Sequence, residues 1–220
     1  MLATDVGRRE RKKLETRDRI VQCAVSLFVS QGYEATTIEE IGDCADVSRA
    51  TVFNYFARKE DLVLAWFERR RADLAERIAD GAEHAPGTPR LRHGLRTIAR
   101  LYEEDPAVSR AMVRAWLRAG GPLLGPNTED SAIVAHAIRE AQRAGDIRLD
   151  VDADGAGLIL LDAYFGALYR WVSDEDGRRS FEDDLLGMLD LLLAGMAHKR
   201  SNRAPTSPSA PRPTSGRVTS

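Results

Sequence analysis

The side chains best suited to chemistry in this sequence surround a short predicted helix that follows Ser48. Val52 and Phe56 stand four residues apart, so they share one face of that helix. The side chains expected to point away from this face are Arg49, Ala50, Thr51, Asn54 and Tyr55. Arg49 can reach guanine O6 and N7, Asn54 can bind adenine, and Ala50 or Thr51 can touch thymine methyl groups. This set indicates readout of base edges in a DNA major groove.

Two polar side chains beside that set, and Tyr55 within it, are suited to phosphate contacts. Thr37, Tyr55 and Lys59 are placed to hold DNA phosphates, which fix the register of a protein on the duplex without reading its sequence. A generic helical hairpin with polar outer faces is the alternative interpretation. It accounts for the periodicity, but not for the coincidence of a small residue, a turn, a helix cap and outward Arg, Thr, Asn and Tyr.

Two short helices joined by a turn are needed to position these side chains. The first is expected to open with a Ser/Thr-x-x-Glu capping box, either Thr36–Glu39 or Thr37–Glu40. Gly42 lets a second helix cross closely above the first. Asp46–Val47 then makes a tight turn and Ser48 caps the second helix. This order predicts a helix-turn-helix.

Over roughly Leu14–Leu64 the sequence resembles the TetR family of bacterial transcriptional regulators. The resemblance rests on Phe28, Gly32-Tyr33, Thr36-Thr37, Ile38-Glu-Glu-Ile41, Ala45-Asp-Val-Ser48, Thr51-Val-Phe-Asn-Tyr-Phe56 and Lys59-Glu-Asp-Leu62. It implies that DNA contacts fall on Thr37, Ser48, Arg49, Thr51, Asn54, Tyr55 and Lys59. It also implies that Lys59–Asp80 links a DNA-reading unit to a helical ligand domain.

Two positions depart from the family pattern. Asp46 stands where the turn usually carries Gly, and Asp tolerates a left-handed backbone only moderately well. Arg58 stands where Ser or Asn commonly caps the next helix, so a weaker cap is expected there. Neither residue lies on the predicted reading surface, so these departures concern stability rather than function.

The chain as a whole is predicted to be all-α, with about nine helices. Apolar residues recur at spacings of three and four, and long period-two alternation is absent. After the linking helix, further helices are expected over 90–104, 107–119, 129–144, 152–173 and 180–198. We expect a basic flexible arm (1–13), a helix-turn-helix DNA-binding domain (14–58), a helical ligand-binding and dimerisation domain (59–200) and a disordered, Pro- and Ser-rich tail (201–220).

The last two predicted helices are apolar on more than one face and therefore need more than one neighbour. Pairing with their copies would bury this excess, and the family dimerises there. The expected dimer contacts are Leu161, Phe165, Leu168, Leu185, Leu189, Leu192 and Met196. The alternative is that all of these residues belong to the core of one subunit.

Large side chains on separate helices of the second domain are candidates to line an apolar ligand cavity. They are Trp66, Tyr102, Met112, Trp116 and Tyr164. Any helical core also contains such residues. The arginine-rich face around Arg69, Arg70, Arg71 and Arg77 is expected to be solvated.

Several other classes of protein are disfavoured. Cys23 and Cys44 are expected to be small core residues rather than a disulfide, and no metal-ligand spacing occurs, so neither a metal nor another cofactor is expected. No phosphate-cradling fingerprint follows a strand, and no local catalytic signature is present, so catalysis is not expected. The apolar stretch Leu191–Ala197 is too short to span a bilayer, and a cytoplasmic protein without membrane contact is expected.

The sequence therefore predicts a homodimeric, ligand-responsive repressor that binds a palindromic DNA operator. A small, largely apolar effector would release it by favouring another state. A structural helical dimer without DNA binding would require a damaged recognition helix, which the sequence does not show. The N-terminal cations, Arg8 to Lys13, have two open interpretations: insertion beside a minor groove, or general attraction to DNA.

Overall fold

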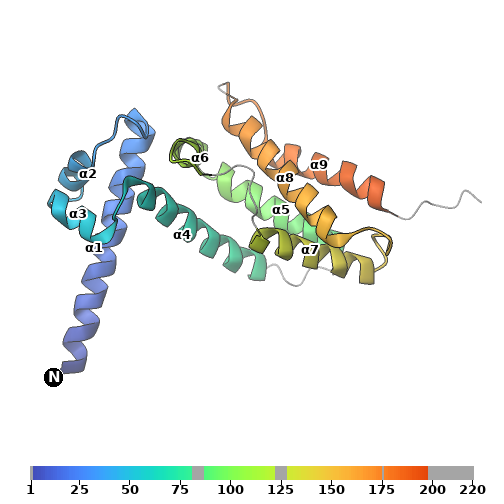
Figure 1. Ribbon diagram of the computed structural model, residues 1–220, viewed down its shortest axis with the longest axis horizontal. Coiled ribbons are helices and arrows are strands. Elements are labelled where there is room, and N and C mark those ends of the chain that lie inside the picture. Colours follow the sequence, from blue (N-terminus) through green and yellow to red (C-terminus); the bar gives the residue numbers. More distant parts are fainter. Residues whose placement is uncertain (1, 81–86, 122–127, 175, 198–220) are drawn as a thin grey trace, which may run out of the picture.

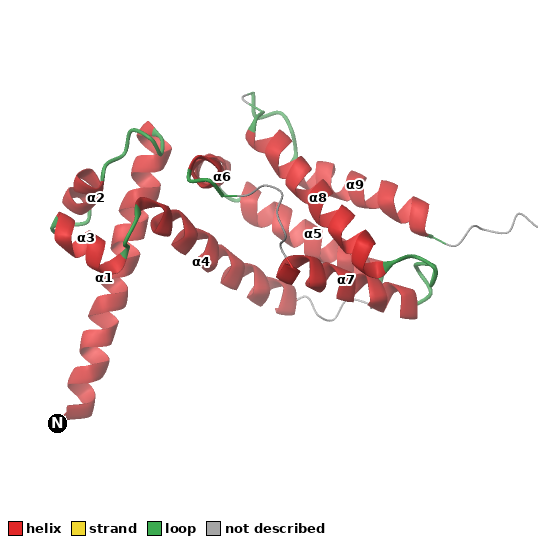
Figure 2. Ribbon diagram, viewed as in Figure 1, coloured by secondary structure: helices red, strands yellow, loops and turns green. Residues whose placement is uncertain are grey.

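The computed structural model describes residues 2–80, 87–121, 128–174 and 176–197, and every regular element within these ranges is an α-helix (Figure 2). The helices are α1 (Leu2–Gln31), α2 (Ile38–Cys44), α3 (Arg49–Tyr55), α4 (Lys59–Asp80), α5 (Thr88–Glu103), α6 (Pro106–Arg118), α7 (Thr128–Arg143), α8 (Ala153–Val172) and α9 (Phe181–Met196). The predicted all-α fold is confirmed. Among the described helices, none has the length and apolar content that crossing a bilayer requires.

The helices form two groups joined by α4 (Figure 1). We call α1 to α3 the head and α5 to α9 the body. Within the body, α7 packs against α8 and α5 against α9. Helix α6 lies at the junction, where it packs against α1 as well as α4. The head is therefore attached to the body through two helices.

Two apolar clusters hold these groups together. The head cluster contains Ile20, Ala24, Phe28, Ile41, Val52, Phe56, Leu62, Val63, Trp66, Met112 and Ala115 among its buried residues. The body cluster contains Leu95, Tyr102, Ile138, Leu160, Leu168, Trp171, Phe181, Leu185 and Leu189 among its own. Met112 and Ala115 come from α6, so this helix of the body supplies part of the head's core.

Most helix bounds agree with the sequence-based expectation to within two residues. Gly32 and Gly145 follow α1 and α7 with φ of 86° and 83°, the left-handed conformation that ends helices most readily in glycine. The N-terminal arm that was expected to be flexible is helical instead, because α1 begins at Leu2 and includes residues 2–13. The expected tail, 201–220, lies outside the described residues. The division between 14–58 and 59–200 is a proposal.

The expectation for the two cysteines is wrong, because the structure joins them in a disulfide. Cys23 Sγ and Cys44 Sγ are 2.18 Å apart, and their Cα atoms are 5.8 Å apart. Cys23 is buried on the inner face of α1, whereas Cys44 is exposed at the last residue of α2. The sequence places the two residues 21 positions apart and gives no sign of the angle at which α2 returns to α1. The bridge therefore fastens the first helix of the predicted helix-turn-helix to α1.

Reduction of this disulfide is expected to destabilise the head. A bridge closing a loop of this length is worth about 3 kcal/mol through the entropy of the unfolded chain. We expect the denaturant midpoint, followed by circular dichroism, to fall when reductant is added to the native chain. The double variant Cys23→Ser/Cys44→Ser should show the lower midpoint with or without reductant. Two free thiols in the unreduced, denatured chain would contradict the assignment.

Candidate DNA interface

The first helix of the motif, α2, is held by a complete capping box. Thr37 Oγ1 accepts a hydrogen bond from the backbone N–H of Glu40 at 3.2 Å, and Glu40 Oε2 accepts one from the N–H of Thr37 at 2.8 Å. The bond from the Thr37 N–H lowers the pKa of the Glu40 carboxyl. Of the two capping boxes considered, the structure therefore contains Thr37–Glu40. Thr36 is buried instead, and its hydroxyl donates to the Gly32 carbonyl.

The turn between α2 and α3 has the backbone expected of it. Asp46 has φ of 52°, so it adopts the left-handed conformation anticipated for this position. The Val47 N–H donates to the Gly42 carbonyl at 2.9 Å, which closes the turn. Ser48 caps α3 by accepting from the Thr51 N–H at 3.1 Å. These bonds fix the direction in which α3 leaves the turn.

Gly42 is where the two helices of the motif come closest. A Cβ atom added at Gly42 would lie 2.8 Å from the Val47 carbonyl oxygen, a backbone atom that cannot rotate away. We expect Gly42→Ala to lower the free energy of unfolding by about 1–3 kcal/mol through overpacking, and to weaken DNA binding by tilting α3. Gly94→Ala is the matched control. It lies within α5 with no atom near the added Cβ, so it should be neutral or stabilising.

Helix α3 shows the two faces that the sequence predicts. Val52 and Phe56 are 0% and 3% exposed and anchor it to the head cluster. The exposed side chains of α3 are Arg49, Ala50, Phe53 and Asn54, while Thr51 and Tyr55 are half-buried. Phe53 is 40% exposed and was not among the predicted contacts. The sequence does contain a signal for Phe53, because this residue lies beside Arg49 on a helical wheel.

Arg49 is the only cation within α3, and its guanidinium contacts two neighbouring side chains. Its guanidinium lies 2.7 Å from a carboxylate oxygen of Glu39 in α2 and 5.4 Å from the centre of the Phe53 ring. Both members of the ion pair are more than half exposed. Exposed pairs contribute less than about 1 kcal/mol. Arg49 can therefore leave Glu39 for a guanine at little cost.

The Lys59 side chain is engaged within the head, and its contact with a DNA phosphate stays a prediction. Its ammonium donates to the carbonyl oxygens of Tyr33 and Thr36 at 2.8 and 3.0 Å, and it lies 4.2 Å from the centre of the Tyr33 ring. Two of its three protons are thus engaged inside the head. Lys59 holds the segment between α1 and α2, and one donor is left for a phosphate.

The N-terminal cap of α4 is also stronger than the side chain of Arg58 alone would provide. Asp61 Oδ2 accepts a hydrogen bond from the Arg58 N–H at 2.9 Å, and Asp61 Oδ1 lies 3.2 Å from the Arg58 guanidinium. The carboxylate three residues into the helix therefore supplies an acceptor that the side chain of Arg58 cannot provide. This is one half of a capping box.

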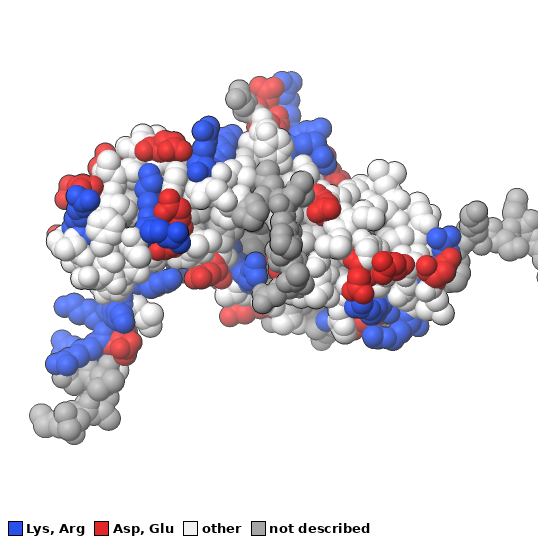
Figure 3. Space-filling model, viewed as in Figure 1, with Lys and Arg blue, Asp and Glu red and all other residues white. Residues whose placement is uncertain are grey.

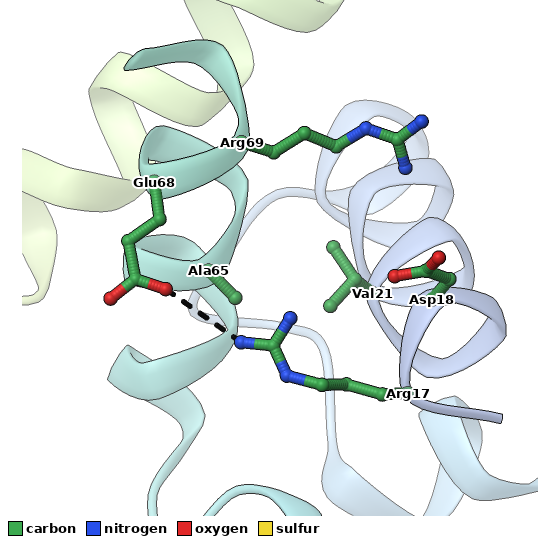
Figure 4. A pocket seen from close by; sticks show the side chains of 6 residues that line it. All are labelled: Arg17, Asp18, Val21, Ala65, Glu68 and Arg69. Atoms are coloured by element: carbon green, nitrogen blue, oxygen red, sulfur yellow. Dashed lines mark ion pairs between the residues drawn. The ribbon is translucent and has the colours of Figure 1, made fainter. Parts of the chain in front are cut away.

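A cleft of about 380 Å³ lies between α1 and α4, close to the head (Figure 4). Its lining residues are Arg17, Asp18, Val21, Ala65, Glu68 and Arg69. Arg17 reaches across the cleft toward Glu68, with an N···O distance of 3.7 Å. Four charged side chains on an open rim do not resemble an apolar ligand cavity.

The five predicted ligand residues occupy two neighbouring regions rather than one. Trp66 and Met112 belong to the head cluster, with Trp116 packed against it, whereas Tyr102 belongs to the body cluster, with Tyr164 packed against that. Ring contacts connect the two regions, with centroid distances of 4.9 Å for Trp66–Phe67, 5.7 Å for Phe67–Trp116, 6.4 Å for Trp116–Phe165 and 5.1 Å for Phe165–Tyr164. Burial raises the pKa of the Tyr102 and Tyr164 phenols, which bond to each other.

Four of the seven predicted dimer contacts are buried within the chain's own core, and the other three are partly buried. Leu161, Leu168, Leu185 and Leu189 are at most 9% exposed. Phe165, Leu192 and Met196 are partly buried against the body cluster. The large apolar side chains that α8 and α9 do expose are Leu158, Ile159, Tyr169 and Leu191, at 49%, 57%, 51% and 79%. Helices that are apolar all round gave no indication of which side would face inward.

Comparison with known proteins agrees with this geometry. Residues 20–66 match the family model described as "Bacterial regulatory proteins, tetR family". Over 58 residues the chain is 45% identical to the HTH-type transcriptional regulator TcmR of Streptomyces glaucescens, a match that spans 26% of each chain. It is 26% identical over 192 residues to the HTH-type transcriptional repressor KstR of Rhodococcus jostii, covering 84% of this chain and 86% of that one.

Similarity to solved structures extends over both head and body. The structure of FadR from Thermus thermophilus, described as a TetR-family transcriptional repressor in complex with lauroyl-CoA, superposes with a TM-score of 0.63 at 28% identity. The alignment covers 87% of this chain and 100% of that one. The arrangement of the body is therefore shared as well as that of the head.

Proposed function

Since the chain belongs to the TetR family of bacterial transcriptional regulators, we propose that it is a repressor that binds a palindromic operator as a dimer and is released by a small, largely apolar molecule. The observation that carries the proposal is the form of α3, which Val52 and Phe56 anchor to the head while Arg49 and Asn54 are exposed.

Dimerisation follows from the limited reach of one recognition helix. A single helix contacts only a few base pairs, so such proteins gain affinity by binding two half-sites about 34–36 Å apart. We assign the contact between subunits to the exposed residues Leu158, Ile159, Tyr169 and Leu191. Gly187 and Gly195 lie on α9 with open space above them, which allows the backbone of a partner helix to approach closely. An isologous four-helix contact would bury this surface.

The proposed effector response is supported by the contacts between head and body. The ring contacts from Trp66 to Tyr164 run through α4, α6 and α8, and α6 also supplies Met112 to the head cluster. A ligand that displaces these rings would move α6 and α4, and with them the head. Arg70 lies 5.0 Å from the centre of the Trp66 ring and donates to Ser109 Oγ. One cation therefore lies beside these aromatic rings. The lauroyl-CoA bound by FadR likewise combines an apolar chain with a polar group.

The test is to capture sheared genomic DNA of the source organism on the purified chain at physiological salt and to sequence what remains bound. We expect enrichment of a palindromic motif beside a small number of genes. The capture is repeated after the chain is unfolded and refolded, so that any retained effector is removed. Random coverage in both experiments would contradict the proposal.

A further inference from the structure

Helix α1 continues for several turns beyond the part that packs in the head. Its first contacts with the rest of the head are made by Arg17, whose guanidinium lies 5.2 Å from the centre of the Phe56 ring, and by Arg19, whose Nε donates to the Ala45 carbonyl at 2.8 Å. Residues 7–15 are all exposed. Figure 1 shows this extension projecting past α3, with the N-terminus at its far end. At about 1.5 Å per residue, 7–15 alone add roughly 12 Å of helix.

Four of the five cations of this extension lie toward one side of the helix, and Arg11 lies on the other. Positions 9, 13, 16, 20, 24 and 27 follow the spacing of three and four residues that defines one side of a helix. Ile20 and Ala24 on this side are 0% and 1% exposed because α2 to α4 cover them. Arg9 and Lys13 therefore stand on the same side, beyond the point where the cover ends.

A second row of positions along α1 also faces the side on which α2 lies. Arg8 and Lys12 precede Arg19 and Cys23 along one edge of this face. Arg19 is bonded to the end of α2, and Cys23 is joined to Cys44 of α2 by the disulfide. Lys and Arg side chains gather on the projecting part of α1 in Figure 3. The cationic face is thus turned to the side of α1 on which α2 and α3 lie.

Three of the four cations on this side of the extension stand without an ion pair within the described part of the chain. Among the described residues, Arg8, Lys12 and Lys13 form no ion pair, although Glu10 and Glu15 lie on the same extension. Like charges four residues apart, as in Arg8 and Lys12, destabilise a helix by a few tenths of a kcal/mol. At the near end of the extension, Asp18 and Glu68 line the cleft shown in Figure 4. A polyanion beside the head would relieve this repulsion.

We propose that the extension of α1 is a second DNA-binding element, which lies along the backbone flanking each half-site and contacts phosphates through Arg8, Arg9, Lys12 and Lys13. The inference rests on the proposed function, because α3 in the major groove is what brings DNA to this side of α1. Such contacts add affinity and salt dependence without reading sequence. Sequence selectivity remains with α3.

The test uses a random-sequence 40-base-pair duplex as the probe, so no operator needs to be known. The variant is Arg8→Gln/Lys12→Gln/Lys13→Gln, in which glutamine preserves helix propensity. Each lost phosphate contact should reduce the slope of log K against log salt concentration by about 0.9 in magnitude. We expect a slope smaller by roughly 2–3 for each bound head, and affinity at physiological salt lower by roughly 10- to 100-fold.

The matched control is Arg118→Gln/Arg143→Gln/Arg178→Gln, which removes the same charge from exposed positions of the body. Circular dichroism checks that both variants keep the native helix content. A control that equals the native chain, with a reduced slope only in the α1 variant, supports the inference. Equal slopes in all three chains would overturn it while leaving the proposed function standing. A native chain that fails to bind the duplex at low salt would overturn both.

Discussion

The double variant Arg49→Ala/Asn54→Ala is expected to lose selective DNA binding while its head stays folded. Both side chains are exposed on α3 and neither contributes to the head cluster. A good bidentate contact to a base is worth about 1–3 kcal/mol, and a dimer makes each contact twice. We therefore expect the affinity for a captured operator fragment to fall by at least about 10³-fold. Affinity for random duplex should change much less, because one cation per head is lost.

The matched control for this variant is Arg118→Ala/Gln22→Ala, which removes one cation and one amide from exposed positions on α6 and α1. It should bind the operator as the native chain does. Titration of labelled operator and random duplexes with all three chains measures the ratio of specific to general affinity. An operator affinity within about threefold of the native value in the α3 variant would refute our placement of the recognition helix.

The second large effect is expected at the proposed contact between subunits. Ile159→Arg/Leu191→Arg places two charges per chain in a surface that an isologous contact would bury twice over. We expect the dimer to dissociate, with sedimentation giving the mass of one chain. Loss of the second head removes bivalency, so operator affinity should fall by about 10²- to 10⁴-fold.

Ile133 and Leu149 provide the control for the dimer variant. They are 68% and 79% exposed, outside α8 and α9, so Ile133→Arg/Leu149→Arg adds the same charge to equally exposed apolar positions. This variant should remain dimeric. Dissociation in both variants, or in neither, would contradict the assignment of the interface to the exposed face of α8 and α9.

Local signals in the sequence were enough to predict the frame of the interface. The capping residue Thr37, the left-handed turn at Asp46 and the cap at Ser48 each act within four residues, so their chemistry can be read from neighbours in the chain. The same holds for α4, whose bounds agree with the apolar pattern and the breaker after it. Periodicity also separated the anchored face of α3 from its exposed one.

What the sequence did not predict depends on the angles between helices. The disulfide requires α2 to return its last residue to Cys23, and the inward position of Lys59 requires carbonyl groups more than twenty residues away. On α8 and α9 the difficulty is different. Apolar residues surround both helices, so the pattern reports that two neighbours exist but not which side each neighbour occupies.

The most direct test of the central claim, that α3 reads a major groove in each half-site, is methylation interference on a captured operator fragment. Methylation modifies guanine at N7 in the major groove and adenine at N3 in the minor groove. We predict interference at guanine N7 in two patches about one helical turn apart on one side of the duplex, lost in the Arg49→Ala/Asn54→Ala chain. Interference confined to adenine N3, or a pattern unchanged in the double variant, would contradict the claim.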